Sequence, residues 1–348
     1  MPTSPPMKLK VAAAHIAPVF LDVAATVQKA CTWIEKAGKE GIDLVVFPEV
    51  FIPGFPYWIN CYPPLAQGEM NRRYMRASIQ VPGPEVEQLA AAAGRAGVAV
   101  VMGASERDHM TCYNTQIFID KDGRYLGKHR KLQPTYAERF IWGQGDGSTL
   151  RVWDTAVGRL GGLACWEHTM NLARQALILQ HIQIHAASWP ALSTLVGFDQ
   201  MFDQQVDAMC RNHAITGQCF VIVAEETVTD DAIRIIEEAL GPQQMMSAGG
   251  GWSTIIGPWG VHLVEPHTGP EERLVAVDID LGDIEIVKGV VDNAGHYSRP
   301  EILHLELNTT PQRNLHLSAP FRDAVEASAR ETGAEAEDAP VTRLQAGE

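Results

Sequence analysis

The sequence predicts an α/β domain built on mixed sheets. Segments with the pattern of strands alternate along the chain with segments of helical periodicity, and no linker of distinct composition separates them. One pair of strand-like segments is closed by the turn Lys121-Asp122-Gly123. An Asp-Gly turn between alternating apolar and polar residues is typical of an antiparallel hairpin. We therefore expect one domain, in which hairpins add antiparallel strands to helix-connected ones.

In the first half of the chain, apolar runs of strand length alternate with helices. LKVAAAHI (9–16) and IDLVVFPE (42–49) are such runs, and the helix between them (24–38) has apolar residues at helical spacing. Helix 85–96 then leads to the strand VAVVMGAS, 98–105. The hairpin with the Asp-Gly turn follows, and its two strands are YNTQIFID and RYLGKHRKL.

The second half repeats the alternation of strands and helices. A hairpin over about 150–165 ends on a cysteine, and TDDAIRIIEEAL has the pattern of a helix within an insertion at 226–250. The remaining expected elements are helix 171–180, strand 182–189, helix 203–216, strand 219–225, a hairpin over GGGWSTIIGPWGVHLVEP and strand 272–281.

Composition excludes several classes of function. The chain has 348 residues, 46% of them hydrophobic, which is enough to bury a large core. A net charge of −14 argues against nucleic acid or an anionic membrane as the main partner. No segment resembles a signal peptide or a membrane span, so we expect a cytoplasmic protein whose six cysteines are reduced. None of them forms a C-x-x-C pair.

Three residues stand out because each ends an expected strand. Glu49 ends LVVFPE, Lys131 ends the second strand of the Asp-Gly hairpin, and Cys165 ends the apolar run RLGGLAC. Taken singly, they are typical of a solvated turn, a basic surface face and a buried thiol. Alternation along the hairpin strand places Lys131 and His129 on one face and the neighbouring basic residues on the other.

Together the three residues supply a base, a cation and a nucleophile. Ligand sites in α/β folds lie at the carboxyl ends of strands. A partly desolvated carboxylate there can act as a general base, and a lysine can stabilise developing negative charge. A thiol becomes a nucleophile when such groups assist its ionisation.

In this order, the three residues lie within stretches that resemble the nitrilase branch of the carbon–nitrogen hydrolase superfamily. The matching stretches are VFPEVFIPGFPYW, HRKLQPTYAERFIWGQGDGS, GRLGGLACWEH, IHAASWP and DNAGHYSRPEIL. The resemblance implies a four-layer αββα sandwich and subunits that pair into homo-oligomers, as dimers and in higher spiral assemblies. It places a hydrolase domain at 8–310 and a C-terminal extension at 311–348. That extension is poor in large apolar residues from about 323, so we expect its end to be disordered.

The resemblance also assigns roles to four residues. It implies that Glu49 is the general base, Lys131 the stabilising cation and Cys165 the nucleophile. A fourth residue, Glu138 in PTYAER, is implied to orient the lysine, although by sequence alone it reads as an ordinary exposed carboxylate. The chain departs from the family pattern after CWEH: it reads TMNL where a proline is usual, which leaves the shape of the local pocket open.

Other patterns carry less weight. The glycine-rich GQGDGS lacks the strand–loop–helix frame of a phosphate site, so we interpret it as a structural loop. His181 and His185 have a helical metal-ligand spacing, but an expected strand there puts them about 13 Å apart. Tyr57, Trp166 and Trp189 are placed equally well in the core or in the wall of a substrate pocket.

We therefore expect a nitrilase that converts an organic nitrile to a carboxylic acid and ammonia through a thioimidate and a thioester on Cys165, with no metal or organic cofactor. An amidase-type carbon–nitrogen hydrolase and a catalytically inactive oligomeric scaffold are the alternatives. The sequence does not distinguish aliphatic, aromatic and arylacetonitrile substrates.

Overall fold

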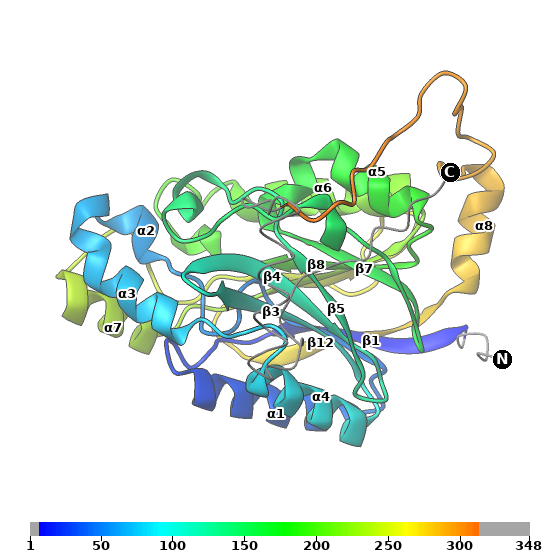
Figure 1. The fold of residues 1–348 in the computed structure, drawn as a ribbon. Coiled ribbons are helices and arrows are strands. Elements are labelled where there is room, and N and C mark those ends of the chain that lie inside the picture. Colours follow the sequence, from blue (N-terminus) through cyan, green and yellow to red (C-terminus); the bar gives the residue numbers. More distant parts are fainter. Residues whose placement is uncertain (1–6, 313–348) are drawn as a thin grey trace, which may run out of the picture. The chain divides into compact units, whose positions relative to one another are not determined.

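Two six-stranded sheets form the interior of the chain (Figure 1). The computed structural model describes residues 7–312. Sheet A has the strand order β12 (Arg273–Asp280), β1 (Lys8–His15), β2 (Leu44–Val46), β3 (Ala99–Asp108), β4 (Thr111–Ile119) and β5 (Tyr125–Arg130). Sheet B has the order β11 (His267–Thr268), β10 (Trp252–Ile256), β9 (Phe220–Glu225), β8 (Ile184–Trp189), β7 (Gly158–Ala164) and β6 (Trp153–Thr155).

Both sheets mix parallel and antiparallel pairs, as the sequence predicts. The central strands β1, β2 and β3 of sheet A run parallel, and so do β7, β8 and β9 of sheet B. Hairpins add the antiparallel strands β4 and β5 to one sheet and β6 to the other. The parallel strands are continuous buried runs because both of their faces are covered.

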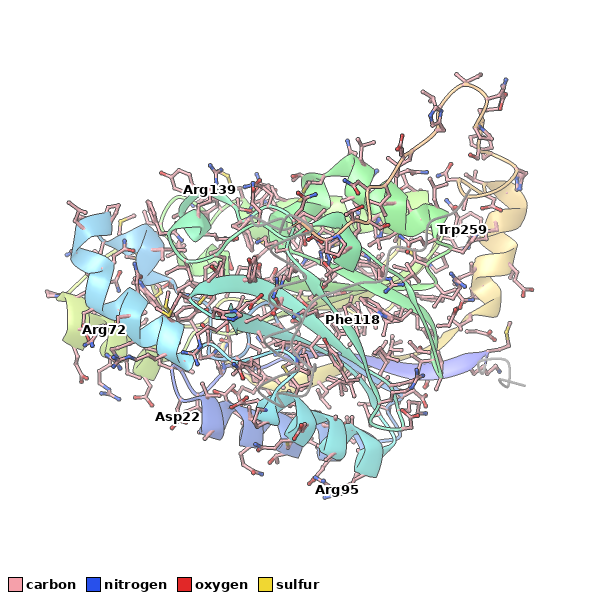
Figure 2. The ribbon with its side chains drawn as sticks, in the orientation of Figure 1. Asp22, Arg72, Arg95, Phe118, Arg139 and Trp259 are labelled. Carbon is pink, nitrogen blue, oxygen red and sulfur yellow. The ribbon has the colours of Figure 1, made fainter. Side chains whose placement is uncertain are left out.

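Helices cover the outer face of each sheet. The helices are α1 (Val23–Lys39), α2 (Trp58–Cys61), α3 (Gly68–Ala77), α4 (Pro84–Ala96), α5 (Asn171–Leu179), α6 (Phe202–Gly217), α7 (Asp230–Leu240) and α8 (Gly282–Val290). α1 and α4 share one apolar core with sheet A, and α5 and α6 share another with sheet B (Figure 1). A third core lies between the sheets, where Phe118 stacks on Trp153 with ring centres 4.1 Å apart (Figure 2). The chain is therefore a four-layer αββα sandwich.

Local sequence fixes the ends of the covering helices. The side chain of Asp22 caps α1 by accepting a hydrogen bond from the Ala25 amide. Pro84 stands in the first turn of α4, where its missing amide hydrogen costs nothing. Gly97 ends α4 in the left-handed region with φ 67°, which glycine adopts without strain.

The main differences from the expected elements lie in β2 and in three helices. β2 ends at Val46 and does not continue to residue 49, because the chain turns at Pro48 and leaves the sheet. α2 and α3 lie in the segment between β2 and α4, where no helix was expected. The sequence of α3 is mostly polar, so apolar periodicity does not predict it. α8 was not expected either.

The C-terminal extension expected at 311–348 lies outside the described residues except for 311 and 312. The domain boundaries at 8 and 310 therefore stay a prediction. In the described part of the chain, every helix is too short or too polar to cross a membrane.

Candidate active site

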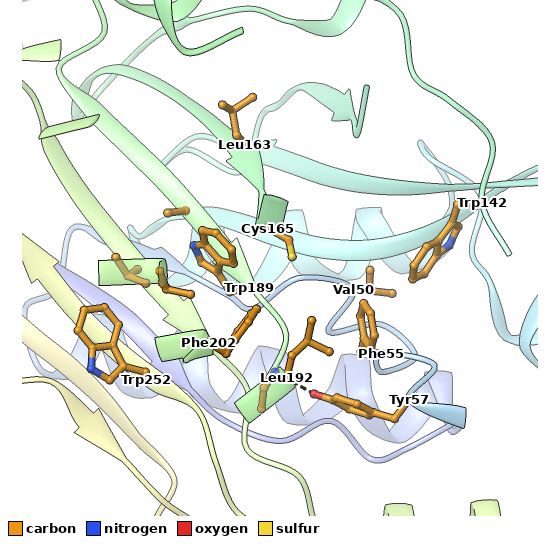
Figure 3. Packing of buried hydrophobic residues seen from close by; sticks show 14 of the residues in the cluster. Val50, Phe55, Tyr57, Trp142, Leu163, Cys165, Trp189, Leu192, Phe202 and Trp252 are labelled. Carbon is orange, nitrogen blue, oxygen red and sulfur yellow. Dashed lines mark hydrogen bonds between the residues drawn. The ribbon is translucent and has the colours of Figure 1, made fainter. Parts of the chain in front are cut away.

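Cys165 lies directly after β7 and opens the 3-10 turn Cys165–Thr169. Its φ of 51° is in the left-handed region, which costs a non-glycine residue about 1–3 kcal/mol. The side chain is fully buried, and its sulphur points toward the part of the core where Val50 and Phe55 lie (Figure 3). His168 donates a hydrogen bond from Nδ1 to the Cys165 carbonyl (2.7 Å) and so holds the turn that presents the thiol.

Glu49 lies beyond the end of β2, on a segment that crosses toward sheet B. The crossing passes so close to β3 that a Cβ on Gly103 would lie 2.1 Å from the Pro48 carbonyl oxygen, so only glycine fits there. The Glu49 amide donates a hydrogen bond to the Trp189 carbonyl at the end of β8 (3.4 Å). The fully buried carboxylate is thus held between the two sheets.

Lys131 directly follows β5. It lies on the same face as His129, as alternation along the strand predicts, and this face is buried. Lys131 and His129 are each 1% exposed. Lys128 and Arg130 point the other way and both form ion pairs with the buried Glu106. These two basic residues therefore neutralise a buried carboxylate rather than forming a plain surface face.

Glu138 comes from the 3-10 turn Tyr136–Phe140 and is only 4% exposed. Its Oε2 accepts a hydrogen bond from the Thr135 amide (3.0 Å), which caps the turn. The same carboxylate reaches the ammonium group of Lys131, so one side chain both orders the turn and enters the site.

Glu49, Lys131, Glu138 and Cys165 meet in one buried group, which we call the polar cluster. The Lys131 Nζ lies 2.8 Å from Glu49 Oε1 and 2.7 Å from Glu138 Oε2. The Cys165 Sγ and one carboxylate oxygen of each glutamate all lie within 4.8 Å of one another. Asn114 donates a second hydrogen bond to Glu49 Oε1 (2.6 Å). Glu49 Oε2 has no partner among the described residues and is free to accept a proton.

Burial and neighbouring charges set the protonation states of this cluster. Burial raises the pKa of Glu49 to about 7, although Lys131 opposes the shift. Burial alone would lower the pKa of Lys131, but Glu138 and Glu49 together raise it well above its usual value. Burial and the Glu49 carboxylate raise the pKa of Cys165 well above its usual value. The resting thiol is therefore protonated, and it needs a base to become a nucleophile.

Glu167 fastens the two strand ends that carry Lys131 and Cys165. It is 1% exposed and accepts hydrogen bonds from the Leu132 amide (2.7 Å) and the Ala164 amide (2.8 Å). His129 approaches both of its oxygens, at 3.1 and 3.2 Å. One buried carboxylate thus fixes the backbone next to the cation and the backbone next to the thiol.

The donor set of the polar cluster also has the spacing of a metal site, since Glu49, Glu138 and Cys165 are close enough to share an ion. The ammonium of Lys131 already binds both carboxylates. A divalent cation in the same place would have to sit beside that charge, so the arrangement favours the lysine over a metal.

The three residues expected in the core or in the pocket wall have different surroundings. Tyr57 is 2% exposed, and its hydroxyl donates a hydrogen bond to Glu226 Oε1 (2.6 Å) and accepts one from the Ala191 amide. Trp189 is fully buried in the same apolar core as Cys165 (Figure 3). Trp166 is half-buried at the edge of that core. Their contact with substrate stays a prediction.

The glycine-rich segment GQGDGS packs against the strand that ends at Lys131. The Gly145 amide donates a hydrogen bond to the Lys131 carbonyl (2.8 Å), and a Cβ on Gly145 would lie 2.2 Å from the Arg130 carbonyl oxygen. The segment is a structural loop, as interpreted from the sequence. His185 hydrogen-bonds to His168 rather than sharing a ligand with His181, which is exposed.

Sequence reasoning missed Asn114, Glu167 and Glu226. Asn114 lies on β4 opposite the hairpin strand, and the amide–carboxylate contact with Glu49 spans 65 positions of the chain. No local pattern marks such a partner. Glu167 lies in CWEH, two positions after the candidate nucleophile Cys165. This position is a sequence signal that could have identified it.

Comparison with known proteins finds relatives that match most of the chain. The family model for carbon–nitrogen hydrolases matches residues 10–288. An aliphatic nitrilase of Rhodococcus rhodochrous is 42% identical over 308 residues, which cover 87% of this chain and 84% of the relative. A nitrilase of Paraburkholderia phymatum is 40% identical and covers 87% of each chain. Nitrilase 2 of Arabidopsis thaliana is 40% identical over 85% of this chain and 87% of its own.

Solved structures match the fold at lower identity. A Saccharomyces cerevisiae protein from branch 10 of the nitrilase superfamily superposes with a TM-score of 0.62 at 21% identity, covering 83% of this chain and 96% of that one. A carbon–nitrogen hydrolase from Helicobacter pylori gives a TM-score of 0.65 at 19% identity, covering 82% and 93%.

Proposed function

Because the chain belongs to the carbon–nitrogen hydrolase family, we propose that it is a nitrilase whose nucleophile is Cys165. It converts an organic nitrile and two water molecules to a carboxylic acid and ammonia. The observation that carries the proposal is the polar cluster: a buried thiol with a lysine ammonium shared between two carboxylates beside it. Relatives at 38–42% identity that are described as nitrilases support the choice of nitrile as substrate.

In the first half of the reaction, Glu49 takes the proton of the Cys165 thiol, and the sulphur adds to the nitrile carbon. The free Oε2 of Glu49 is the atom suited to receive that proton. Glu49 passes this proton to the nitrile nitrogen as the carbon–sulphur bond forms, which gives a thioimidate and leaves Glu49 ionised for the next step. Lys131 stabilises the negative charge that develops on the nitrogen.

In the second half, Glu49 activates a water molecule that adds to the thioimidate carbon. Ammonia leaves with the electron pair of the carbon–nitrogen bond, and a thioester remains. A second water releases the carboxylic acid and returns the thiol. Glu138 acts as a positioning residue in this scheme, because its two contacts keep the ammonium of Lys131 beside Glu49.

Ammonia release from a panel of aliphatic, aromatic and arylacetonitriles tests the proposal. We expect turnover by the wild type and essentially none by Cys165→Ala, which should keep the wild-type circular dichroism spectrum. Wild-type turnover in that variant would show that Cys165 is not the nucleophile. EDTA should leave the rate unchanged, because the scheme assigns no step to a metal or organic cofactor.

The amidase alternative is tested with the same panel and the matching primary amides. A nitrilase releases ammonia from the nitriles faster than from the amides, whereas an amidase shows the reverse order. An inactive scaffold releases ammonia from neither set.

We further propose that the chain works in the cytoplasm as a homo-oligomer. The outer helical layer on sheet B exposes large apolar side chains, among them Leu172 on α5 (70% exposed) and Ile215 on α6 (49% exposed). A second subunit placed on this layer would remove them from water. The proposed small-molecule partner is the nitrile, and the acidic net charge argues against nucleic acid and membrane surfaces.

A further inference from the structure

Three fully buried histidines lie next to the turn that carries the nucleophile. His168 belongs to that turn, His185 comes from β8 and His213 from α6, the helix that covers sheet B. The Nε2 atoms of His168 and His185 are 2.9 Å apart, and the ring centres of His185 and His213 are 4.1 Å apart. The reaction proposed above gives none of the three a role.

All three imidazole rings are neutral near pH 7. Burial lowers the pKa of His168 to about 4. Burial, and next the neighbouring His213, lower the pKa of His185 well below its usual value, and burial does the same to His213. The charge of Arg174 acts on each ring in the same direction. A neutral imidazole has one N–H and one unprotonated nitrogen, so it donates at one nitrogen and accepts at the other.

The hydrogen bonds of His168 and His185 determine which nitrogen of each ring is protonated. The Cys165 carbonyl oxygen can only accept, so the proton of His168 is on Nδ1, at 2.7 Å from that oxygen. The Nε2 atom of His168 is then an acceptor, and the Nε2 atom of His185 must carry the proton between them. The unprotonated Nδ1 of His185 has no hydrogen-bond partner in residues 7–312. Donation therefore runs in one direction, from His185 to His168 to Cys165.

The carbonyl that His168 binds belongs to the peptide group between Cys165 and Trp166. Burial has the largest effect on the pKa of the Cys165 thiol and raises it, whereas the Trp166 amide, the N–H of this same peptide group, acts on the thiol to lower it. The φ of Cys165 is 51°, and a left-handed conformation of this kind persists only where its surroundings over-determine it. The hydrogen bond from His168 fixes one end of the peptide group and so keeps the other end directed at the sulphur.

We propose that His168, kept as its Nδ1–H tautomer by His185, is a positioning residue that orients the Cys165–Trp166 peptide for nucleophilic attack. The inference rests on the nitrilase function proposed above and adds a residue to its machinery. As Glu49 takes the proton of the thiol, the oriented Trp166 N–H stabilises the negative charge that develops on the sulphur. No proton passes along the histidines, whose hydrogen bonds stay in place throughout the reaction.

Two variants separate the hydrogen bond from packing. The His168 ring stacks on Trp189, with ring centres 4.8 Å apart and an angle of 21° between the ring planes. His168→Phe keeps a ring for this contact but has no donor, whereas His168→Asn keeps a donor at the position of Nδ1 but has no ring. A misplacement of about 1 Å costs on the order of 10²-fold in rate.

We therefore expect kcat of His168→Phe to fall by about 10- to 100-fold, with KM within about twofold of the wild type. His168→Asn should recover most of the lost rate. His181→Asn changes an exposed histidine between α5 and β8, and it is the matched control.

Two further measurements need no nitrile. Alkylation of Cys165 by iodoacetamide at a fixed pH, followed by mass spectrometry of the peptide that contains it, should be slower in His168→Phe than in His168→Asn. NMR spectroscopy of the wild type with isotope-labelled histidine distinguishes protonated from unprotonated ring nitrogens, and it should find the proton of His168 on Nδ1 and that of His185 on Nε2.

A packing role predicts the opposite order of the two variants. A His168→Phe enzyme that matches the wild type, or a His168→Asn enzyme that is slower than His168→Phe, would therefore overturn the inference. NMR signals that place the proton of His168 on Nε2 would also contradict it, and this measurement does not depend on the folding of a variant. A wild type that turns over no nitrile removes the proposed function. The alkylation rates then decide the inference, because equal rates in the two variants contradict it and a slower His168→Phe supports it.

Discussion

Replacing Glu167 should break the hydrogen bonds that link the end of β5 to the end of β7. The carboxylate has four hydrogen-bond contacts, two of them to backbone amides, of which the contact with Ala164 is buried and that with Leu132 is part-buried. Glutamine offers one acceptor oxygen, so its NH₂ group must face either the Leu132 amide or the Ala164 amide. An unsatisfied buried donor costs about 1–3 kcal/mol, and we expect Glu167→Gln to lose about that much free energy of unfolding. Glu167→Ala leaves both amides unsatisfied and should lose about twice as much.

The same variant should lower turnover more than a general loss of stability explains. Leu132 follows the cation and Ala164 precedes the nucleophile, so a shift of either backbone moves a reacting group. A misplacement of about 1 Å costs on the order of 10²-fold in rate. We therefore expect kcat of Glu167→Gln to fall by about 10- to 100-fold under conditions in which the variant is fully folded.

The pH dependence of stability gives a separate signature. Burial tends to raise the pKa of Glu167, but His129 and the two backbone amides outweigh it and lower the pKa below its ordinary value of 4.5. A lowered pKa means that the unfolded chain binds this proton more readily, so the stabilisation is complete above pH 4.5 and is lost as the pH falls below it. Glu167→Gln lacks this contribution, and its stability should fall less steeply in that range.

Urea unfolding followed by tryptophan fluorescence, at fixed protein concentration, measures the first effect, and ammonia release measures the second. Glu69→Gln, an exposed residue of α3 that pairs with Arg72, is a control that should change neither. A Glu167→Gln protein with an unfolding free energy within about 0.5 kcal/mol of the wild type and an unchanged kcat would refute the reasoning.

Four further outcomes are expected. Because burial raises the pKa of Glu49 to about 7 and only its ionised form accepts a proton, kcat should fall as the pH drops below about 7; a rate that stays flat down to pH 5 would exclude Glu49 as the base. Lys131→Met should leave two buried carboxylates without their cation, so we expect a loss of ammonia release together with about 3–5 kcal/mol of stability, measured by urea unfolding. Tyr57→Phe removes the hydroxyl between Glu226 and the Ala191 amide, and should raise KM more than it lowers kcat in a steady-state assay. Light scattering should find at least a dimer at micromolar concentration, and a fully active monomer would rule out the assembly proposal.

Much of the fold follows from local patterns, because the strands of the two sheets are apolar runs and their hairpins carry recognisable turns. The alternation of HRK correctly places His129 and Lys131 on the buried face. The strand order within each sheet has no such local signal, because neighbours such as β1 and β12 are separated by most of the chain. The layered arrangement was expected only through the resemblance to a family.

The site was predictable to the extent that its residues end strands. Lys131 and Cys165 directly follow β5 and β7, and both are buried. Glu138 gave no signal of its own, since a polar turn between aromatic residues reads as surface. Its burial depends on a lysine seven positions away in the chain, and such a partner becomes visible only when the tertiary contacts are known.

The double role of Glu138 ties the charge of the active site to the local folding of a short surface turn. Tyr136 and Phe140 of that turn are 80% and 53% exposed, so Ala137, at 6% exposure, is its apolar contact with the core. Local opening of such segments costs less free energy than global unfolding. Each opening withdraws one of the two counter-ions of Lys131 and leaves the Thr135 amide without its acceptor. In the proposed mechanism, such openings lower the fraction of molecules ready for catalysis, and amide hydrogen exchange at Thr135 measures the opening equilibrium without any substrate.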